Sequence, residues 1–269
     1  MIQHNSTDAY APAEIAQRVE SAGVAKAGLA TIPTLVLAVL AGAFIAFGAM
    51  LYVVVVTNSG LGFGPERLLG GLAFSLGLIL VLVGGAELFT GNSLIVFAWA
   101  DRKITGTRLL RNWGLVYLGN FIGATATAVM VHWSGIHNLA DGAVAATAMS
   151  IAEAKLALAP IEAFIRAILC NVLVCLAVWL CFAARSVAGK ILAIVFPISG
   201  FVALGFEHSV ANMYLIPAGW LAGSELVTTG GYAANLLVVT IGNVIGGGVL
   251  VALVYWLVYR RAASQDIEA

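Results

Sequence analysis

Gly85-Ala86-Glu87-Leu88-Phe89-Thr90-Gly91-Asn92 interrupts one long apolar stretch of the chain, and Gly205-Phe206-Glu207-His208-Ser209-Val210-Ala211-Asn212 interrupts another. Both segments follow the pattern G-x-E-x-x-x-small-N. Each is followed, at nearly the same spacing, by a G-N-x-x-G motif, at residues 119–123 and 242–246. The two halves of the chain therefore look like copies of one unit.

Each interruption places a carboxylate and an amide inside sequence that otherwise suits hydrocarbon. Unpaired polar groups are costly in a bilayer core, so such breaks are tolerated where they line a cavity. Matched breaks in two halves of a membrane protein are the strongest sequence indication of a transport site near the bilayer midplane. The pattern therefore predicts a membrane transport protein.

The composition supports this interpretation, since 61% of the residues are hydrophobic and only 10% are charged. The formal net charge is zero and no basic or acidic block occurs, which argues against nucleic acid as a partner. The three cysteines lie within residues 170–181, and their spacing matches neither a redox pair nor a zinc site. We expect no metal, no cofactor and no cleaved signal peptide.

Six apolar runs are long enough to cross a bilayer core, which requires about 20 helical residues. They cover residues 32–57, 68–100, 113–133, 161–184, 191–221 and 232–259, with the second and fifth broken by the two interruptions. Six spans form two units of three, at 32–133 and 161–259. Because three is odd, the second unit enters from the opposite side, which predicts an all-α integral membrane protein built from two inverted three-helix repeats.

The remaining segments are predicted to lie outside the membrane. Residues 1–31 form an amphipathic cytoplasmic segment at the membrane surface, residues 134–160 an extracytoplasmic connection, and residues 260–269 a cytoplasmic tail. With both termini inside, ten of the 13 lysines and arginines are cytoplasmic, and only Arg67, Lys155 and Arg166 remain outside. This asymmetry predicts the orientation.

His208 is the only histidine expected at membrane depth, where an ionisable side chain is a functional candidate. Imidazole is well suited to exchange a proton near neutral pH, although a neutral ring bonded to the broken backbone is the alternative. Glu87 and Glu207 occupy matching positions and are expected to support the breaks, together with Asn92. The polar residues assigned to the substrate pore and proton relay are His208, Thr90, Asn171, Ser209 and Asn212.

The segments GAELFTGN (85–92), CNVLVCLAVW (170–179) and GFEHSVANM (205–213), with the two GN-containing helices, closely resemble the formate/nitrite transporter family. The resemblance extends from about Ala11 to Tyr259. It implies an aquaporin-like fold, a homopentamer with a pore in every protomer, and a location in the bacterial inner membrane.

The resemblance also implies roles for residues near the breaks. Apolar side chains would constrict the pore on either side of a histidine chamber; these are Phe74, Leu78, Leu88, Val174 and Phe201. Thr90, Asn171 and His208 would face the chamber, and Lys155 would attract anions at its outer approach. The implied substrates are formate, nitrite or similar small anions such as hydrosulfide and lactate.

Two mechanisms remain open at this stage. Polar groups at the breaks could replace part of the anion's hydration shell, or a weak-acid anion could take a proton through His208 and cross as neutral acid. A water or glycerol channel is a rival with the same repeat, but its paired Asn-Pro-Ala motifs are absent from this sequence. An enzyme is disfavoured because no nucleophile with an orienting base is evident.

Overall fold

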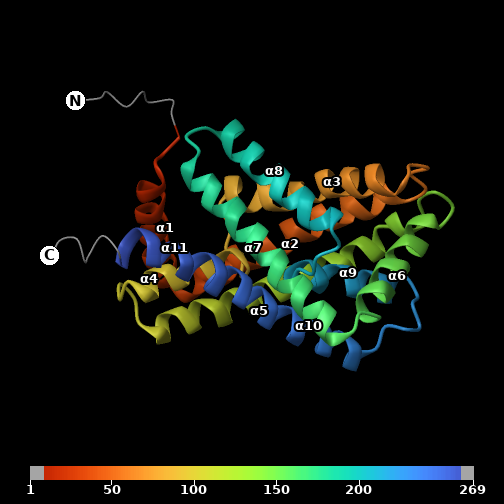
Figure 1. Cartoon of the computed structure of the whole chain (residues 1–269). Helices are drawn as coiled ribbons and strands as arrows, with labels where there is room; N and C mark the ends of the chain where they lie inside the picture. Colours follow the sequence, from red (N-terminus) through yellow and green to blue (C-terminus); the bar gives the residue numbers. More distant parts are fainter. Residues whose placement is uncertain (1–8, 262–269) are drawn as a thin grey trace, which may run out of the picture.

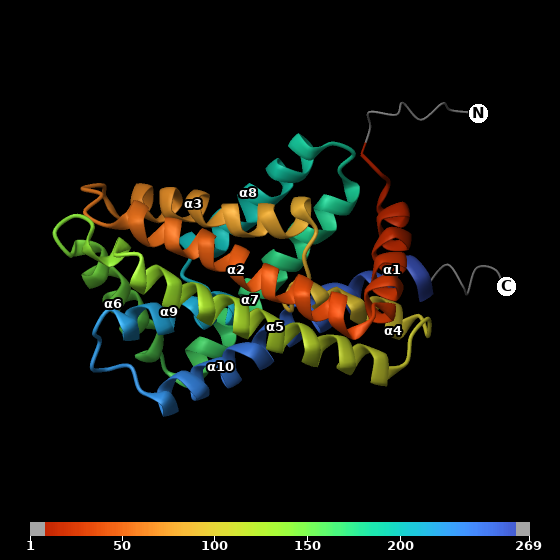
Figure 2. The same ribbon diagram turned by 180° about the vertical axis from the view of Figure 1, so that it is seen from behind.

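The computed structural model describes residues 9–261, and all regular elements in that range are helices (Figure 1). Residues 1–8 of the predicted N-terminal segment, and residues 262–269 of the predicted tail, lie outside the described residues. Both described ends of the chain lie at the same end of the helical bundle (Figures 1 and 2).

The first half of the chain contains α1 (Pro12–Gly28), α2 (Thr31–Val56), α3 (Phe63–Gly84), a 3-10 turn (Gly91–Ile95), α4 (Val96–Ala100) and α5 (Gly106–Trp133). The second half contains α6 (Ala143–Leu156), α7 (Pro160–Ala183), α8 (Val187–Ala203), α9 (Ser209–Leu221) and α10 (Thr229–Val244). α10 continues through a π-helical stretch (Ile245–Leu253), α11 (Val254–Trp256) and a last turn (Leu257–Arg261).

Five helices of the described chain are long and apolar enough to cross a membrane: α2, α3, α5, α7 and the continuous helix Thr229–Arg260. α3 and α5 begin earlier than predicted. The N-cap residue Thr105 explains the start of α5, because its hydroxyl accepts a hydrogen bond from the Arg108 amide. α8 has 17 residues and α9 has 13, so the predicted break between two half-helices is present.

The predicted connection at residues 134–160 is more regular than the sequence suggested, because most of it forms α6. This helix packs along α9, and Ala152 shares a small buried cluster with Ile216 and Val227. α6 lies at the opposite end of the bundle from α1 in both ribbon views (Figures 1 and 2).

α1 is helical, as predicted, and packs against the protein. Ile15, Ala16 and Val19 are buried in a cluster that includes Ile95 and Phe97 from the segment after the first break. These side chains of the amphipathic helix therefore cover the half-helix that follows the first break.

Close helix contacts occur at matching places in the two halves. A Cβ atom on Gly123 of α5 would lie 2.0 Å from the Val39 carbonyl oxygen of α2. One on Gly246 would lie 2.1 Å from the Ile168 carbonyl oxygen of α7. Any side chain at these glycines would separate helices that hold the two breaks in place.

Candidate functional site: two helix breaks and two cavities

Both half-helices preceding the breaks end at a glycine with left-handed backbone, with φ of 83° at Gly85 and 71° at Gly205. The amide of the residue after each glycine makes a hydrogen bond to the preceding helix. The Ala86 amide donates to the Val81 carbonyl, and the Phe206 amide donates to the Phe201 carbonyl. This is the usual hydrogen-bonded end of a helix. Residues 86–90 after the first turn, and 207–208 after the second, are buried.

Asn120 of α5 ties down the first break. Its Oδ1 accepts a 2.8 Å hydrogen bond from the Phe89 amide, and its Nδ2 donates to the Glu87 carbonyl at 2.9 Å. Nδ2 also donates to the Ala38 carbonyl of α2 at 2.7 Å. One buried amide thus satisfies backbone groups that the broken helix leaves without partners.

Asn243 of α10 repeats this arrangement at the second break. Its Oδ1 accepts from the Ser209 amide at 2.8 Å, and its Nδ2 donates to the carbonyls of Glu207 at 2.9 Å and Ala167 at 2.8 Å. The two GN motifs are visible in the sequence, but no role was predicted for Asn120 or Asn243. The signal for them in the sequence was an asparagine directly after a helix-packing glycine, repeated in both halves.

Glu87 is 5% exposed and has two partners within the bundle. Lys26 of α1 lies 2.6 Å from its Oε1, and Asn92 Nδ2 donates to its Oε2 at 2.7 Å. The same Asn92 nitrogen donates to Asn112 Oδ1 at 2.9 Å. Glu87 and Asn92 were predicted to support the break. The structure adds the Lys26 ammonium group of α1, which the sequence alone did not connect to this break.

Glu207 is 3% exposed and has the corresponding partners. Lys155 of α6 lies 2.9 Å from Oε1, and Asn212 Nδ2 donates to Oε2 at 2.7 Å and to Asn235 Oδ1 at 2.9 Å. Lys155, predicted to attract anions, is therefore also the counter-ion of a buried carboxylate. Asn212, assigned to the pore from the sequence, thus also joins the second break to α10.

His208 occupies the position after Glu207 and is the N-cap residue of α9. Its Nδ1 accepts a 3.0 Å hydrogen bond from the Ala211 amide, and its Nε2 lies 2.9 Å from Thr90 Oγ1 of the other break. Because Nδ1 accepts, the neutral ring carries its proton on Nε2. Nε2 is therefore the donor that points towards the first break.

Asn171 of α7 connects the first break to α10. Its Nδ2 donates to the Thr90 carbonyl and Ser93 Oγ, both at 3.2 Å, and to the Asn243 carbonyl at 2.6 Å. Its Oδ1 is buried without a partner among the described residues, as is Ser209 Oγ.

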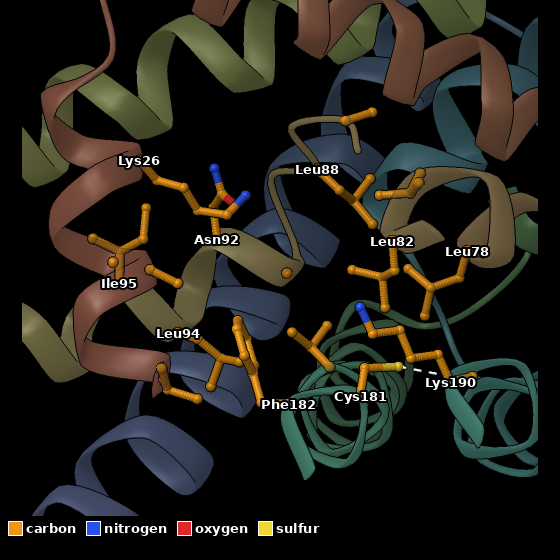
Figure 3. Close-up of a pocket in the computed structure, with 17 residues that line it drawn as sticks. Lys26, Leu78, Leu82, Leu88, Asn92, Leu94, Ile95, Cys181, Phe182 and Lys190 are labelled. Carbon is orange, nitrogen blue, oxygen red and sulfur yellow. Dashed lines mark hydrogen bonds between the residues drawn. The ribbon is translucent and has the colours of Figure 1, made fainter. Parts of the chain in front are cut away.

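A cavity of about 120 Å³, here called the α1-side cavity, opens between α1, α3, α7 and α8. Figure 3 shows Lys26 and Asn92 on one side of this space, with Leu78, Leu88 and Lys190 across from them. Its lining combines lysines with aliphatic side chains.

A second cavity of about 160 Å³, here called the α6-side cavity, lies at the other end of the breaks. Polar and aromatic residues line it: Tyr52, Arg67, Phe74, Lys155, Arg166, Phe201, Glu207 and His208. The two cavities have no lining residue in common.

Four of the predicted constriction residues line one or the other cavity. The rings of Phe74 and Phe201 meet edge to face with centroids 5.5 Å apart, and Phe201 stacks on His208 at 5.8 Å. Phe74 and Phe201 line the α6-side cavity, whereas Leu78 and Leu88 line the α1-side cavity. Thr90, Asn171, Val174, Ser209 and Asn212 are buried and line neither cavity.

Comparisons with known proteins agree with this architecture. The sequence model described as formate/nitrite transporter matches residues 13–257. The chain is 42% identical over 276 residues to a protein named formate channel FocA from Escherichia coli strain K12, covering 96% of this chain and 97% of that protein.

Solved structures give the same answer. A protein titled FNT family ion channel superposes with a TM-score of 0.84 at 30% identity, covering 91% of this chain and 98% of that one. A structure titled pentameric formate channel with formate bound gives a TM-score of 0.79 at 38% identity, covering 85% and 97%. The chain is therefore a multi-pass membrane protein that belongs to the formate/nitrite transporter family.

Proposed function

We propose that this protein is a channel for small monovalent weak-acid anions, with formate as its substrate. The observation that carries the proposal is the placement of His208, which lines the α6-side cavity and reaches Thr90 of the opposite break at 2.9 Å. The relatives named as formate channels support the choice of formate. Nitrite and hydrosulfide are alternative anions that the names of these relatives do not favour.

The anion meets positive charge before it meets apolar walls. Lys155 lines the α6-side cavity and Lys26 the α1-side cavity, and each lies beside a break carboxylate. The route between the cavities then narrows to Phe74, Phe201, Leu78 and Leu88. A bare charge pays a large desolvation penalty in such a zone, so a polar donor is needed there.

His208 supplies that donor. Its Nε2 hydrogen, now shared with Thr90 Oγ1, can be redirected to a carboxylate oxygen arriving past Phe201. A full proton relay needs a second proton on the ring, and the available position is Nδ1. Nδ1 already accepts a hydrogen bond from the Ala211 amide. Proton relay therefore requires that this capping hydrogen bond opens, at a cost of about 1 kcal/mol.

We further propose that the chain lies in the bacterial inner membrane as a homopentamer with a pore in every protomer. The α1 end, which carries both described chain ends and the basic loop between α4 and α5, would face the cytoplasm (Figure 1). Residues 32–133 and 161–259 would be the two inverted repeats. The matching bonds of Asn120 and Asn243, and of Glu87 and Glu207, support the repeat.

Flux measurements in proteoliposomes test this function. Purified wild-type protein is compared with His208→Phe for uptake of formate, nitrite, hydrosulfide, lactate and glycerol between pH 5 and 8. We expect wild-type protein to conduct formate with a pH-dependent rate. The variant, which has no ring donor, should lose both the pH dependence and most of the flux.

Two results would count against the proposal in different ways. Glycerol flux without formate flux in the wild type would reject an anion channel. Formate flux that does not change from pH 5 to pH 8 would reject any role of protonation at His208 while leaving conduction itself intact.

A further inference from the structure

Two arginines line the α6-side cavity without a carboxylate partner within residues 9–261. Arg67 lies near the start of α3 and Arg166 lies in α7. The cavity's other charges balance each other, because Lys155 pairs with Glu207. The net positive charge of the cavity therefore comes from the two guanidinium groups.

Both guanidinium groups converge on the turn at Gly205. A Cβ atom on this glycine would lie 2.6 Å from Arg67 Nη2 and 3.6 Å from Arg166 Nη1. Arg67 Nε donates to the Ala203 carbonyl at 2.9 Å, and Arg166 Nη1 donates to the Gly205 carbonyl at 3.4 Å. One bond on each side chain fixes its position, and the other N–H groups have no acceptor within the described range.

Capping the end of α8 would be an ordinary structural reason for these arginines. The first half of the chain shows that a glycine turn of this kind forms without an arginine beside it. Gly85 makes the same left-handed turn after α3, and nothing lies within 4 Å of its Cβ position. Leu37 occupies the place of Arg166, since the Leu37 carbonyl accepts from Glu87 N and the Arg166 carbonyl from Glu207 N.

We propose that Arg67 and Arg166 form a carboxylate-binding site that concentrates a small monocarboxylate at the α6-side mouth, before the Phe74–Phe201 pair. The inference rests on the proposed function and adds residues to it. A planar guanidinium offers paired N–H donors that match the two oxygens of a carboxylate. Two guanidinium groups that face one point can therefore orient an anion in a way that the single ammonium group of Lys155 cannot. Positive charge in a cleft with apolar walls also raises the local anion concentration.

Single-channel currents in planar bilayers, with formate added to one side, test this site. For the double variant Arg67→Gln/Arg166→Gln, we expect the formate concentration giving half-maximal current to rise about five- to tenfold. The change should appear only when formate enters from the α6 side, and the current at saturating formate should stay the same. The wild-type current at low formate should also fall more steeply with added inert salt than the variant's current.

Matched variants separate charge, geometry and folding. Arg108→Gln removes the same charge from an exposed position on α5 and should leave all currents unchanged. Arg67→Lys/Arg166→Lys keeps the charge but loses the planar guanidinium groups. Its formate concentration for half-maximal current should lie between those of the wild type and the glutamine variant. If the double variant does not fold, Arg166→Leu introduces the residue found at this place in the first half and is measured instead.

The outcomes distinguish the two proposals. No formate current in the wild type would refute the channel function itself. Wild-type current with unchanged half-saturation and unchanged salt dependence in the arginine variants would refute the carboxylate site alone. A lower saturating current from both sides, with unchanged half-saturation, would show that the arginines are structural and would also refute the site.

Discussion

The two helix breaks share one scaffold but differ in the residue that follows the carboxylate. In each, a carboxylate binds a lysine from a preceding helix, and an asparagine ties the extended backbone to the bundle. The residue after the carboxylate is Leu88 in the first break and His208 in the second. The two breaks therefore have the same backbone support, and the ionisable imidazole occurs at the position where the two halves differ in sequence.

The largest expected effect concerns the two carboxylates. Glu207→Ala leaves the Lys155 ammonium, 14% exposed, without its counter-ion, and should destabilise the protein by about 3–5 kcal/mol. Glu87→Ala should cost less, because Lys26 is 32% exposed and water can solvate it. Thermal unfolding in detergent, followed by size-exclusion chromatography, compares the variants. Equal losses would show that solvent access does not distinguish the breaks.

A second prediction concerns the apolar residue that replaces histidine in the first break. Leu88→Ala removes a buried side chain at the closed end of the α1-side cavity and should cost about 2–4 kcal/mol of stability. The wider passage should admit lactate, so that lactate flux rises relative to formate flux in proteoliposomes. The pH profile should stay as in the wild type because His208 is intact. An unchanged lactate-to-formate ratio would place the constriction elsewhere.

A third prediction concerns the bond that joins the breaks. Thr90→Val gives the first break the residue that the second has as Val210, and it removes the hydroxyl 2.9 Å from His208 Nε2. The loss should cost about 1 kcal/mol of stability and lower formate flux several-fold. Thr90→Ser keeps the hydroxyl and serves as the control. Flux equal to that of the wild type in the valine variant would show that His208 acts without Thr90.

The smallest effect concerns the helices that supply the two lysines. α1 is tied to the end of the chain by Glu20 and Arg260, which lie 2.5 Å apart, while Glu153 of α6 accepts from Ser224. Glu20→Gln should change stability by less than about 1 kcal/mol, because Arg260 is 28% exposed and keeps Asp101 as a second partner. Hydrogen exchange should become faster in α1 but not in α6. Faster exchange in both helices would indicate that they are not anchored independently.

Much of the fold could be predicted from the sequence, because apolar length and polar interruptions are local features. The apolar runs and both breaks were evident without coordinates. The helix α6 was missed because its alanine-rich sequence has no clear apolar face. Its place was decided by packing against α9.

The site itself depended on contacts that spacing does not encode. Lys26 belongs to the α1 helix yet pairs with Glu87, 61 residues later, and His208 meets Thr90 across 118 residues. Asn212, which the sequence placed among the pore residues, bonds to Glu207 and to Asn235 of α10, and the spacing along the chain does not identify the second of these partners.

The sequence by itself determined that two polar breaks interrupt a membrane-spanning chain, because a carboxylate within an apolar run is visible wherever the chain folds. Only the tertiary structure decided which groups the breaks face. Arg67 and Arg166 converge on one turn because α3 and α7 both pack against α8. Such convergence arises from helix packing, and the packing sets the distances on which charge and hydrogen bonding depend.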